Sequence, residues 1–294
     1  MLVLRDVPEP EPMDGAVALT VRAAAINFAE VLVRQGRYPK PPELPWIPGV
    51  EVAGETDSGR RVIGLVRSSG GGYAERVSAT TQWLFDLPED ASFEEGAAFL
   101  VAYLTAWIPL TRLASVRPGV RVLVHAAAGG VGTAAVVAAR ALGAEVIGTV
   151  GSPEKLELPR SLGATQTVTY DKLDGIEPVD VVLDPVGGEL FAKSLELLRP
   201  LGVAVPLGFV GGEWPQIDPA QIVGRNIGVR GFFLERLMRR QPDVVAQAAR
   251  DLLRLWEAGV VHPVVGRTFP LAEASQAHRL IEERRSTGKV VLVP

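Results

Sequence analysis

Residues 120–150 read VRVLVHAAAGGVGTAAVVAARALGAEVIGTV, and this stretch predicts a strand, a tight turn, a helix and a second strand. The run from Arg121 to Ala126 is apolar and β-branched, and helix-forming residues continue to Leu142. Gly143 stands where a helix C-cap glycine is expected. Glu145 to Val150 has strand character again. Because a helical crossover joins parallel strands, the stretch predicts a βαβ unit.

The turn between the first strand and the helix carries the chemistry of this unit. In the dinucleotide fingerprint G-x-G-x-x-G, the second glycine lets the backbone approach a pyrophosphate, and the third lets helix and strand pack closely. Gly129 and Gly132 hold these two positions, whereas Ala127 replaces the first glycine. The helix N-terminus favours negative charge. The turn therefore predicts a dinucleotide site, with a plain packing turn as the alternative.

The residue that selects the dinucleotide lies about twenty positions after the fingerprint, where an acidic side chain would bind the ribose 2′-hydroxyl of NAD. The sequence there is Gly151-Ser152-Pro153-Glu154-Lys155, and the strand itself ends without an acidic residue. A small residue, a hydroxyl and a lysine suit a 2′-phosphate, because Lys155 attracts it and a carboxylate would repel it. We therefore expect NADPH, with Glu154 pointing along the following helix. Alternatively, Ser152 is a helix N-cap and Lys155 a solvated residue.

Composition excludes several classes of function. The chain has 294 residues, enough for two domains, and its 47% hydrophobic content is that of a globular protein. A formal net charge of −4 argues against nucleic acid as the main partner. No cysteine is present, which excludes disulfides and thiolate metal sites. The N-terminus lacks a signal-peptide pattern, and the longest uncharged run, 122–139, has three central glycines; we expect a cytoplasmic protein without a membrane span.

Strands and helices alternate from residue 120 to about residue 233, which predicts a parallel sheet that binds ligands outside the carboxyl ends of its strands. Short strands before this region indicate a compact β-rich unit, and they are expected at 16–24, 50–55, 61–66, 73–77 and 83–87. Later strands are expected at 165–170, 179–183, 203–207, 227–233 and 289–293. Helices are expected at 25–36, from a Ser92 capping box through 97–113, and at 189–198, 241–259 and 272–283.

Several motifs occur together and in order: Ile26-Asn27-Phe28-Ala29-Glu30, Pro45 to Gly54, Leu104-Thr105-Ala106, Ala126 to Gly132, Asp184-x-Val186-Gly187-Gly188 and Thr287 to Val291. In this set the chain resembles the zinc-free quinone oxidoreductase branch of the medium-chain dehydrogenase/reductase superfamily, the group that includes zeta-crystallin. The resemblance covers nearly the whole chain. It implies an α/β fold in which a Rossmann domain, a doubly wound parallel sheet, is inserted in a GroES-like β-rich catalytic domain.

The resemblance also implies the domain boundaries. Residues 1–102 would form the first part of the catalytic domain, residues 103–238 the Rossmann NADPH-binding domain, and residues 239–294 the C-terminal part of the catalytic domain. Both ends of the chain then belong to one domain.

Zinc-dependent relatives hold the metal through soft or imidazole ligands. The resemblance puts Asn27 at a cysteine position and Val50 at a histidine position, and His125, His262 and His278 are expected to be structural. No metal site is therefore expected. Without a Lewis acid, the acceptor of the hydride must already be electrophilic.

The resemblance assigns roles to individual residues. Asn27 would lie close to the nicotinamide ribose and the substrate, and Tyr38 would border the substrate cleft and donate a hydrogen bond or a proton. A helix N-cap is the alternative for Asn27, and an aromatic lid for Tyr38. Lys289 would reach the same cleft or be a surface charge. The other implied cofactor contacts are Thr105, Gly129, Gly130, Val131, Gly132, Gly151, Ser152, Lys155, Tyr170, Gly208, Phe209 and Phe233.

These features predict an NADPH-dependent enzyme that reduces a quinone or an α,β-unsaturated carbonyl without zinc. The protein would supply orientation, a dry pocket and hydrogen bonds to the developing oxyanion. Two alternatives stay open: an enoyl or alkenal reductase of the same superfamily, which differs only in pocket shape, and a non-catalytic NADPH-binding module. A homodimer is also expected, because the apolar strand 227–233 would lie at a sheet edge that invites pairing, and the resemblance pairs this edge across a two-fold axis.

Overall fold

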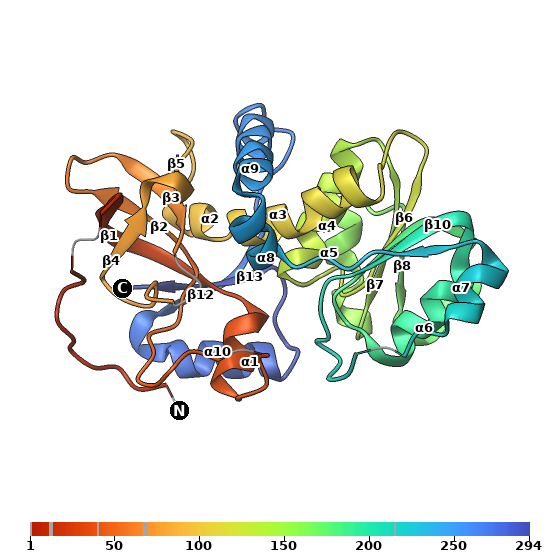
Figure 1. Ribbon diagram of the computed structural model, residues 1–294, viewed down its shortest axis with the longest axis horizontal. Helices are drawn as coiled ribbons and strands as arrows, with labels where there is room; N and C mark the ends of the chain where they lie inside the picture. Colours follow the sequence, from red (N-terminus) through yellow and green to blue (C-terminus); the bar gives the residue numbers. More distant parts are fainter. Residues whose placement is uncertain (1, 12–13, 40, 67–69, 215) are drawn as a thin grey trace. The chain divides into compact units, whose positions relative to one another are not determined.

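The computed structural model of the chain describes residues 2–11, 14–39, 41–66, 70–214 and 216–294. The chain folds into two compact units. The first unit contains both ends of the chain, residues 1–101 and 263–294, and the second unit contains residues 102–262 (Figure 1). The first unit is β-rich and the second unit contains a parallel sheet, in agreement with the α/β fold expected from the sequence.

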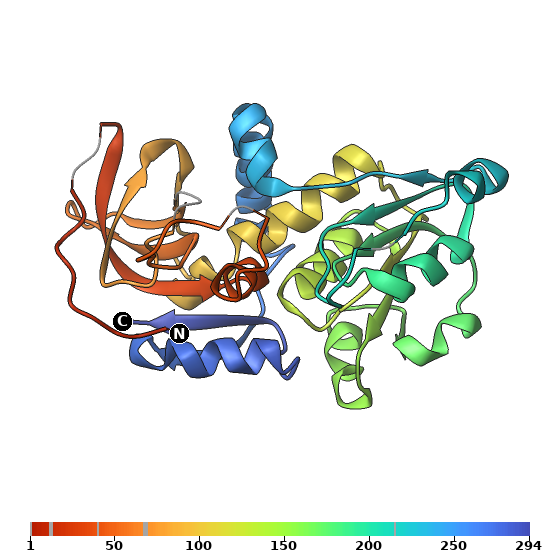
Figure 2. The ribbon, with the colours of Figure 1, turned by 60° about the horizontal axis from the view of Figure 1, so that its bottom comes forward.

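The first unit is built on a seven-stranded sheet of order β12-β13-β1-β2-β3-β5, in which β4 also pairs with β1. Strand β1 pairs antiparallel with β13, so the red N-terminal strand and the blue C-terminal strand lie side by side (Figure 2). Leu19, Val62 and Phe269 are among its buried core side chains. The elements are β1 (Ala16–Ile26), α1 (Phe28–Arg34), β2 (Glu51–Thr56), β3 (Arg61–Leu65), β4 (Arg76–Thr80), β5 (Leu84–Asp86), α2 (Phe93–Ala97), β12 (Val265–Pro270), α10 (Ala274–Glu282) and β13 (Lys289–Val293).

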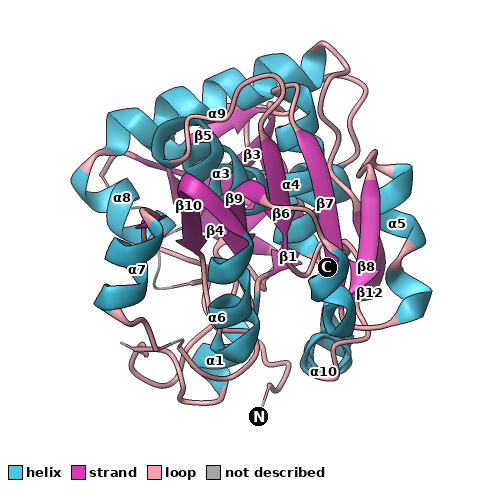
Figure 3. Cartoon of the chain, turned by 90° about the vertical axis from the view of Figure 1, so that its right-hand side faces the viewer, coloured by secondary structure: helices cyan, strands magenta, loops and turns pink. Residues whose placement is uncertain are grey.

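The second unit is a doubly wound parallel sheet of order β11-β10-β9-β6-β7-β8 (Figure 3). The chain steps one way through α4 and α5 and the other way through α6, so right-handed crossovers put α4 and α5 on one face and α6 on the other. The elements are α3 (Leu100–Ile108), β6 (Arg121–Val124), α4 (Gly130–Ala141), β7 (Glu145–Val150), α5 (Glu157–Ser161), β8 (Gln166–Thr169), β9 (Val179–Asp184), α6 (Gly188–Leu197), β10 (Leu198–Pro206), α7 (Pro219–Arg225), β11 (Gly228–Val229), α8 (Leu234–Arg240) and α9 (Pro242–Glu257).

The βαβ unit forms as its sequence predicts. Strands β6 and β7 are parallel neighbours, and helix α4 joins them. Gly143 follows the helix with a φ of 78°, and its N–H donates to the carbonyl of Arg140 at 2.8 Å. This left-handed position closes the helix and turns the chain into β7.

Several elements have other bounds than the expected ones. Strand β1 runs on to Ile26, so helix α1 begins three residues later than expected, and β4 begins at Arg76 rather than 73. The last strand of the parallel sheet, expected at 227–233, is regular only at Gly228 and Val229. Arg230 and Phe232 still donate backbone hydrogen bonds to β10, at 3.0 and 3.4 Å. The ends of a strand depend on which neighbouring strand it pairs with, and the propensity of the local sequence does not reveal that neighbour.

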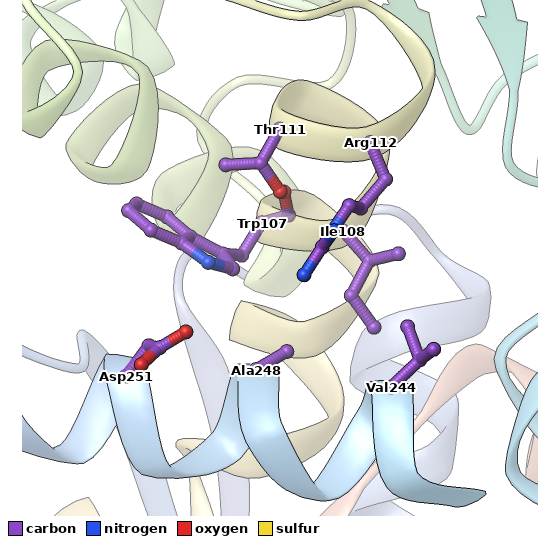
Figure 4. Close-up of a pocket in the computed structure, with 7 residues that line it drawn as sticks. All are labelled: Trp107, Ile108, Thr111, Arg112, Val244, Ala248 and Asp251. Atoms are coloured by element: carbon purple, nitrogen blue, oxygen red, sulfur yellow. The ribbon is translucent and has the colours of Figure 1, made fainter. Parts of the chain in front are cut away.

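The second domain boundary also differs, because residues 239–262 belong to the second unit and not to the expected C-terminal catalytic segment. Val244 and Ala248 of α9 line a cavity together with Trp107 and Ile108 of α3 (Figure 4). An amphipathic pattern gives the buried face of a helix but not the element that covers it. No helix of the described ranges, α9 included, has the length and apolar character to cross a membrane.

Candidate functional site

The turns at the carboxyl ends of the parallel strands form the first candidate site. The strand order reverses between β6 and β9, which makes this pair the switch point of the sheet. In open α/β sheets, ligands bind outside the carboxyl ends of the strands at such a point. Most of the cofactor residues expected from the sequence follow β6, β7, β8 or β10.

Gly132 allows helix α4 to pack close to strand β6. A Cβ atom at Gly132 would lie 2.0 Å from the carbonyl oxygen of Ala126, whereas one at Gly129 would lie 3.3 Å from it. Ala126 takes the left-handed conformation of the turn, with a φ of 49°. Helix α4 begins after Gly129, and the first-turn N–H groups of Gly130, Val131 and Gly132 have no acceptor within the helix. Together with the helix dipole, they form a cradle for an anion such as a pyrophosphate.

The turn after β7 holds the residues that would select the dinucleotide. Ser152 precedes a short 3₁₀ turn, but its hydroxyl makes no capping bond there and donates instead to the carboxylate of Glu154. Glu154 therefore does not point away along the helix as expected, because the Ser152 hydroxyl holds it at the turn. This hydrogen bond lowers the pKa of Glu154, and partial burial lowers the pKa of Lys155 against the opposing charge of Glu154. The ring of Tyr170 lies 3.5 Å from the position of a Cβ at Gly151.

Asp184 shapes the turn after β9, on the other side of the switch point. Its buried carboxylate accepts the N–H of Val186 at 2.6 Å and that of Gly187 at 3.1 Å. Burial raises the pKa of Asp184 to about 6, and the two backbone donors lower it in part. Gly187 has a φ of 77°, which suits glycine, so the carboxylate and the glycine together fix this turn.

The remaining expected residues of the second unit lie on three elements. Gly208 and Phe209 follow β10 and are half-buried, and the Phe209 ring lies 4.7 Å, centroid to centroid, from the ring of Trp214. Thr105 is half-buried on α3. Phe233 precedes α8 and is 48% exposed.

His125 ties the layers of the second unit together. Its Nδ1 and Nε2 atoms each lie 2.6 Å from a hydroxyl, of Thr149 on β7 and of Ser194 on α6. Since Ser194 donates to the carbonyl of Leu190, Nε2 of His125 carries the proton and Nδ1 accepts from Thr149. Burial lowers the pKa of His125 to about 3. The arrangement is that of a neutral structural histidine.

The first unit holds the second candidate site, a buried cluster of Asn27, Glu51 and Lys289. Lys289 Nζ donates to Asn27 Oδ1 at 2.7 Å and also to Glu51 Oε1. Asn27 Nδ2 donates to the same Glu51 oxygen at 3.1 Å, and the second carboxylate oxygen accepts the N–H of Val101 at 2.9 Å. Lys289 is 4% exposed, so the reading of this residue as a surface charge is wrong.

A second buried carboxylate lies behind this cluster. Glu30 Oε2 accepts the N–H of Asn27 at 2.6 Å and Oε1 accepts the N–H of Val50 at 2.9 Å. Tyr73 donates its hydroxyl to Glu30, and this hydroxyl lies 3.1 Å from Nε2 of His278. Burial raises the pKa of Glu30 from 4.5 to about 7, although the N–H of Asn27 and the charge of Lys289 lower it. Burial, with the charge of Arg34, lowers the pKa of His278 to about 4.

Asn27 takes the helix N-cap position that the sequence offered as its alternative role. It is the N-cap residue of α1, with Glu30 at the third helical position bonding back to its N–H, and its side-chain amide belongs to the Lys289 cluster. Tyr38, the other expected catalytic residue, lies half-buried on the segment after α1 in the same unit.

The cluster does not fit a zinc ion. Its donor set is one carboxylate and one amide, and the ammonium of Lys289 already neutralises the carboxylate. In the described part of the chain, no three His, Cys, Asp or Glu side chains form a group that could hold a metal.

The sequence alone did not assign roles to Glu30, Glu51, Tyr73 or Asp184, and it gave His278 only a structural role. For Glu30 a signal was present, since Asn27 and Glu30 have the spacing of a capping box. Glu51 opens an apolar strand, Glu51-Val52-Ala53, where a charged residue calls for a buried partner. The partner itself, Lys289, lies 238 residues away in the sequence.

Comparison with known proteins gives one family. Residues 162–292 match the family model described as zinc-binding dehydrogenase. The synaptic vesicle membrane protein VAT-1 homolog of Rattus norvegicus is 35% identical over 99% of this chain and 80% of its own, and the quinone oxidoreductase-like protein 2 of Bos taurus is 35% identical over 99% and 88%. The crystal structure of the quinone oxidoreductase from Thermus thermophilus, also solved with NADPH, is similar with a TM-score of 0.90 and 43% identity over 99% of this chain and 95% of that chain.

Proposed function

Since the chain belongs to the zinc-free quinone oxidoreductase branch of the medium-chain dehydrogenase/reductase superfamily, we propose that it is an enzyme that passes hydride from NADPH to a quinone or to the β-carbon of an α,β-unsaturated carbonyl. The observation that carries the proposal is the similarity, over 99% of this chain, to a quinone oxidoreductase solved with NADPH. The anion cradle of α4 and the charge of Lys155 support it from this chain's own residues, whereas the carboxylate of Glu154, held by Ser152, opposes a 2′-phosphate.

The residues that would hold NADPH lie on the turns described above. The N–H groups of Gly130 to Gly132, with Gly129, would bind the pyrophosphate, and Gly151, Ser152, Lys155 and Tyr170 would hold the 2′-phosphate. Thr105, Gly208, Phe209 and Phe233 would serve the nicotinamide half. Bound there, NADPH supplies a hydride, that is, two electrons and one proton.

The chain's own part in the reaction is orientation and charge stabilisation. Asn27 holds one Nδ2 hydrogen on Glu51, and its second Nδ2 hydrogen is left to donate to an oxygen of the acceptor as negative charge develops there. Tyr38 borders the acceptor and donates a hydrogen bond. With the hydride delivered, one proton from solvent or from a side chain completes the hydroquinone or the saturated carbonyl.

Cofactor binding tests the nucleotide half of the proposal. Titration of the protein with NADPH and with NADH, followed by cofactor fluorescence, is expected to give the lower dissociation constant for NADPH, because Lys155 favours a 2′-phosphate. Equal or tighter binding of NADH would contradict it. The presence of Glu154 at the same turn makes this a stringent test.

Turnover tests the acceptor half. NADPH oxidation is expected with para-benzoquinones, and a matched panel of 2-alkenals distinguishes the second candidate, an enoyl or alkenal reductase. Tight NADPH binding with no turnover of either panel would instead support a non-catalytic NADPH-binding module. The Asn27 amide, held by Lys289 and Glu51 with one Nδ2 hydrogen left to donate, favours the enzyme, since a binding module has no use for a fixed amide donor.

We also propose that the chain forms a homodimer through the free edge of its parallel sheet. Strand β11 has one neighbour, β10, among the described residues. Leu201, 87% exposed, donates its N–H to Asn226 next to β11, and Val223 on α7 is 76% exposed. Light scattering should report a dimer that Leu201→Asp dissociates and Leu4→Asp, at an exposed site in the first unit, does not. A monomeric wild type at micromolar concentration would contradict the proposal.

A further inference from the structure

The geometry of the buried cluster points to a role for Lys289 and Glu51 that rests on the proposed function. We infer that Lys289 and Glu51 are positioning residues, which hold the amide of Asn27 in a single orientation so that one Nδ2 hydrogen is always presented to the acceptor or the cofactor. Lys289 then acts through Asn27, and not by touching the cofactor itself.

Chemistry fixes the orientation of the amide. An ammonium group can only donate hydrogen bonds, and an ionised carboxylate can only accept them. Asn27 Oδ1 faces Lys289 Nζ at 2.7 Å, and Asn27 Nδ2 faces Glu51 Oε1 at 3.1 Å. Rotation of the amide by 180° would put donor against donor and acceptor against acceptor. Asn27 is therefore a donor of known direction, which a solvated asparagine is not.

The sheet of the first unit brings the three residues together. Ile26 of β1 is paired with Val290 of β13, so Asn27, directly after β1, and Lys289, the first residue of β13, come next in register. Ala24 of β1 is paired with Val52 of β2, which brings Glu51 to the same end of β1. Glu51 and Lys289, which we call the clamp, therefore lie on the two strands that flank β1, and Asn27 directly follows β1.

Burial separates the clamp from the residue that it holds. Glu51 is 1% exposed and Lys289 is 4% exposed, whereas Asn27 is half-buried. Both oxygens of Glu51 are in use, because Oε2 accepts the N–H of Val101. A glutamine at 51 would place its NH₂ group against a donor in either orientation, so the carboxylate is required and not merely a polar group of that size.

A double-mutant cycle tests the inference. Asn27→Ala and Lys289→Met are each expected to lower kcat with NADPH and para-benzoquinone by roughly 10- to 100-fold, the effect of a misplaced reacting group. If Lys289 acts through Asn27, the double variant is no slower than the slower single variant. If Lys289 instead contacts the cofactor directly, Lys289→Met lowers kcat and weakens NADPH binding in the Asn27→Ala protein by the same factors as in the wild-type protein. That result would overturn the inference.

Folding is controlled separately, because Lys289→Met leaves Glu51 charged and unpaired. Lys289→Arg keeps the charge but changes the donor geometry, so it should lower kcat while the unfolding temperature stays near that of wild type. In the Asn27→Ala background, the same substitution should not lower kcat further. Lys193→Met, at an exposed lysine of α6, is the matched control and should leave kcat unchanged. An effect of Lys289→Arg that persists in the Asn27→Ala background would also overturn the inference.

The cycle also separates the inference from the proposed function. A wild-type protein that oxidises NADPH with neither quinones nor alkenals contradicts the proposed function alone. The same four proteins, read by thermal unfolding, then decide whether the clamp exists: coupled shifts in unfolding temperature support it, and additive shifts overturn it.

Discussion

The hydroxyl of Tyr73 lies 3.2 Å from Oε2 of Glu30, and both side chains are buried inside the first unit. Tyr73 donates this hydrogen bond, and Glu30 also receives the N–H groups of Asn27 and Val50. Three hydrogen-bond donors stabilise the charged form of this carboxylate. Burial nevertheless dominates and raises the pKa of Glu30 to about 7, so this group titrates near neutral pH.

Glu30 should make the folded state less stable as the pH rises. Its pKa is about 7 in the folded state and 4.5 as the ordinary value for the unfolded chain. Between these two pH values, the folded state therefore holds a proton that the unfolded state has lost. The protonated Glu30 thus contributes about 3 kcal/mol to the free energy of unfolding below pH 4.5, and this contribution is lost as the pH rises through 7. In Glu30→Gln the titration is absent. We therefore expect the unfolding free energy of the variant, relative to wild type, to rise between pH 5 and pH 8 in urea titrations. A constant difference would contradict the assignment.

His125 should act in the opposite direction. Its pKa falls from 6.5 to about 3 in the folded state, so between these values the unfolded state binds the extra proton. The stability that this histidine contributes is present above pH 6.5 and is lost on acidification, by about 2 kcal/mol at pH 5. The stability difference between wild type and His125→Gln should therefore shrink from pH 7 to pH 5. His262→Gln, at an exposed histidine, is the control for a lost imidazole.

Gly132→Ala and Gly129→Ala should fail in different ways. A methyl group at 132 meets the backbone of Ala126 at 2.0 Å, so the fold should lose about 1–3 kcal/mol or more. A methyl group at 129 meets the same oxygen at 3.3 Å with an ordinary φ of −84°, so the protein should fold. Its affinity for NADPH should fall because the methyl group enters the anion cradle.

Thermal unfolding and NADPH titration of both glycine variants separate the two effects. Gly224→Ala on α7, where a Cβ meets nothing within 4 Å, is the control and should change stability by less than about 1 kcal/mol. Wild-type stability of Gly132→Ala would show that the turn relaxes and that close packing is not the reason for this glycine.

Lys155 and Glu154 should shift the choice of cofactor in opposite directions. Lys155→Met removes the charge that favours a 2′-phosphate, so the dissociation constant of NADPH should rise about tenfold or more while that of NADH stays unchanged. Glu154→Gln removes a carboxylate that is hydrogen-bonded to Ser152, so it should lower the dissociation constant of NADPH and leave that of NADH unchanged. Fluorescence titration with both cofactors measures each ratio. Equal changes for NADH would mean that neither residue faces the 2′-phosphate.

Local sequence predicted the part of the fold that local interactions control. Alternation of apolar residues and the glycines of residues 120–150 gave β6, α4 and β7, because strand period, helix capping and close turns are each properties of a few consecutive residues. For the same reason Gly143 ends α4 and Lys289–Val293 forms β13 as expected.

Tertiary structure decided where long-range partners control the outcome. The sequence placed Lys289 in a cleft or on the surface, and the structure buries it against Glu51 and Asn27. The sequence placed the end of the Rossmann domain at residue 238, whereas the second unit extends to residue 262 because α9 packs within it. A buried charge needs a partner and an apolar face needs a cover, and neither partner is encoded nearby: the pairing of β1 with β13 brings residues 26 and 290 into contact, and only the folded chain holds that information.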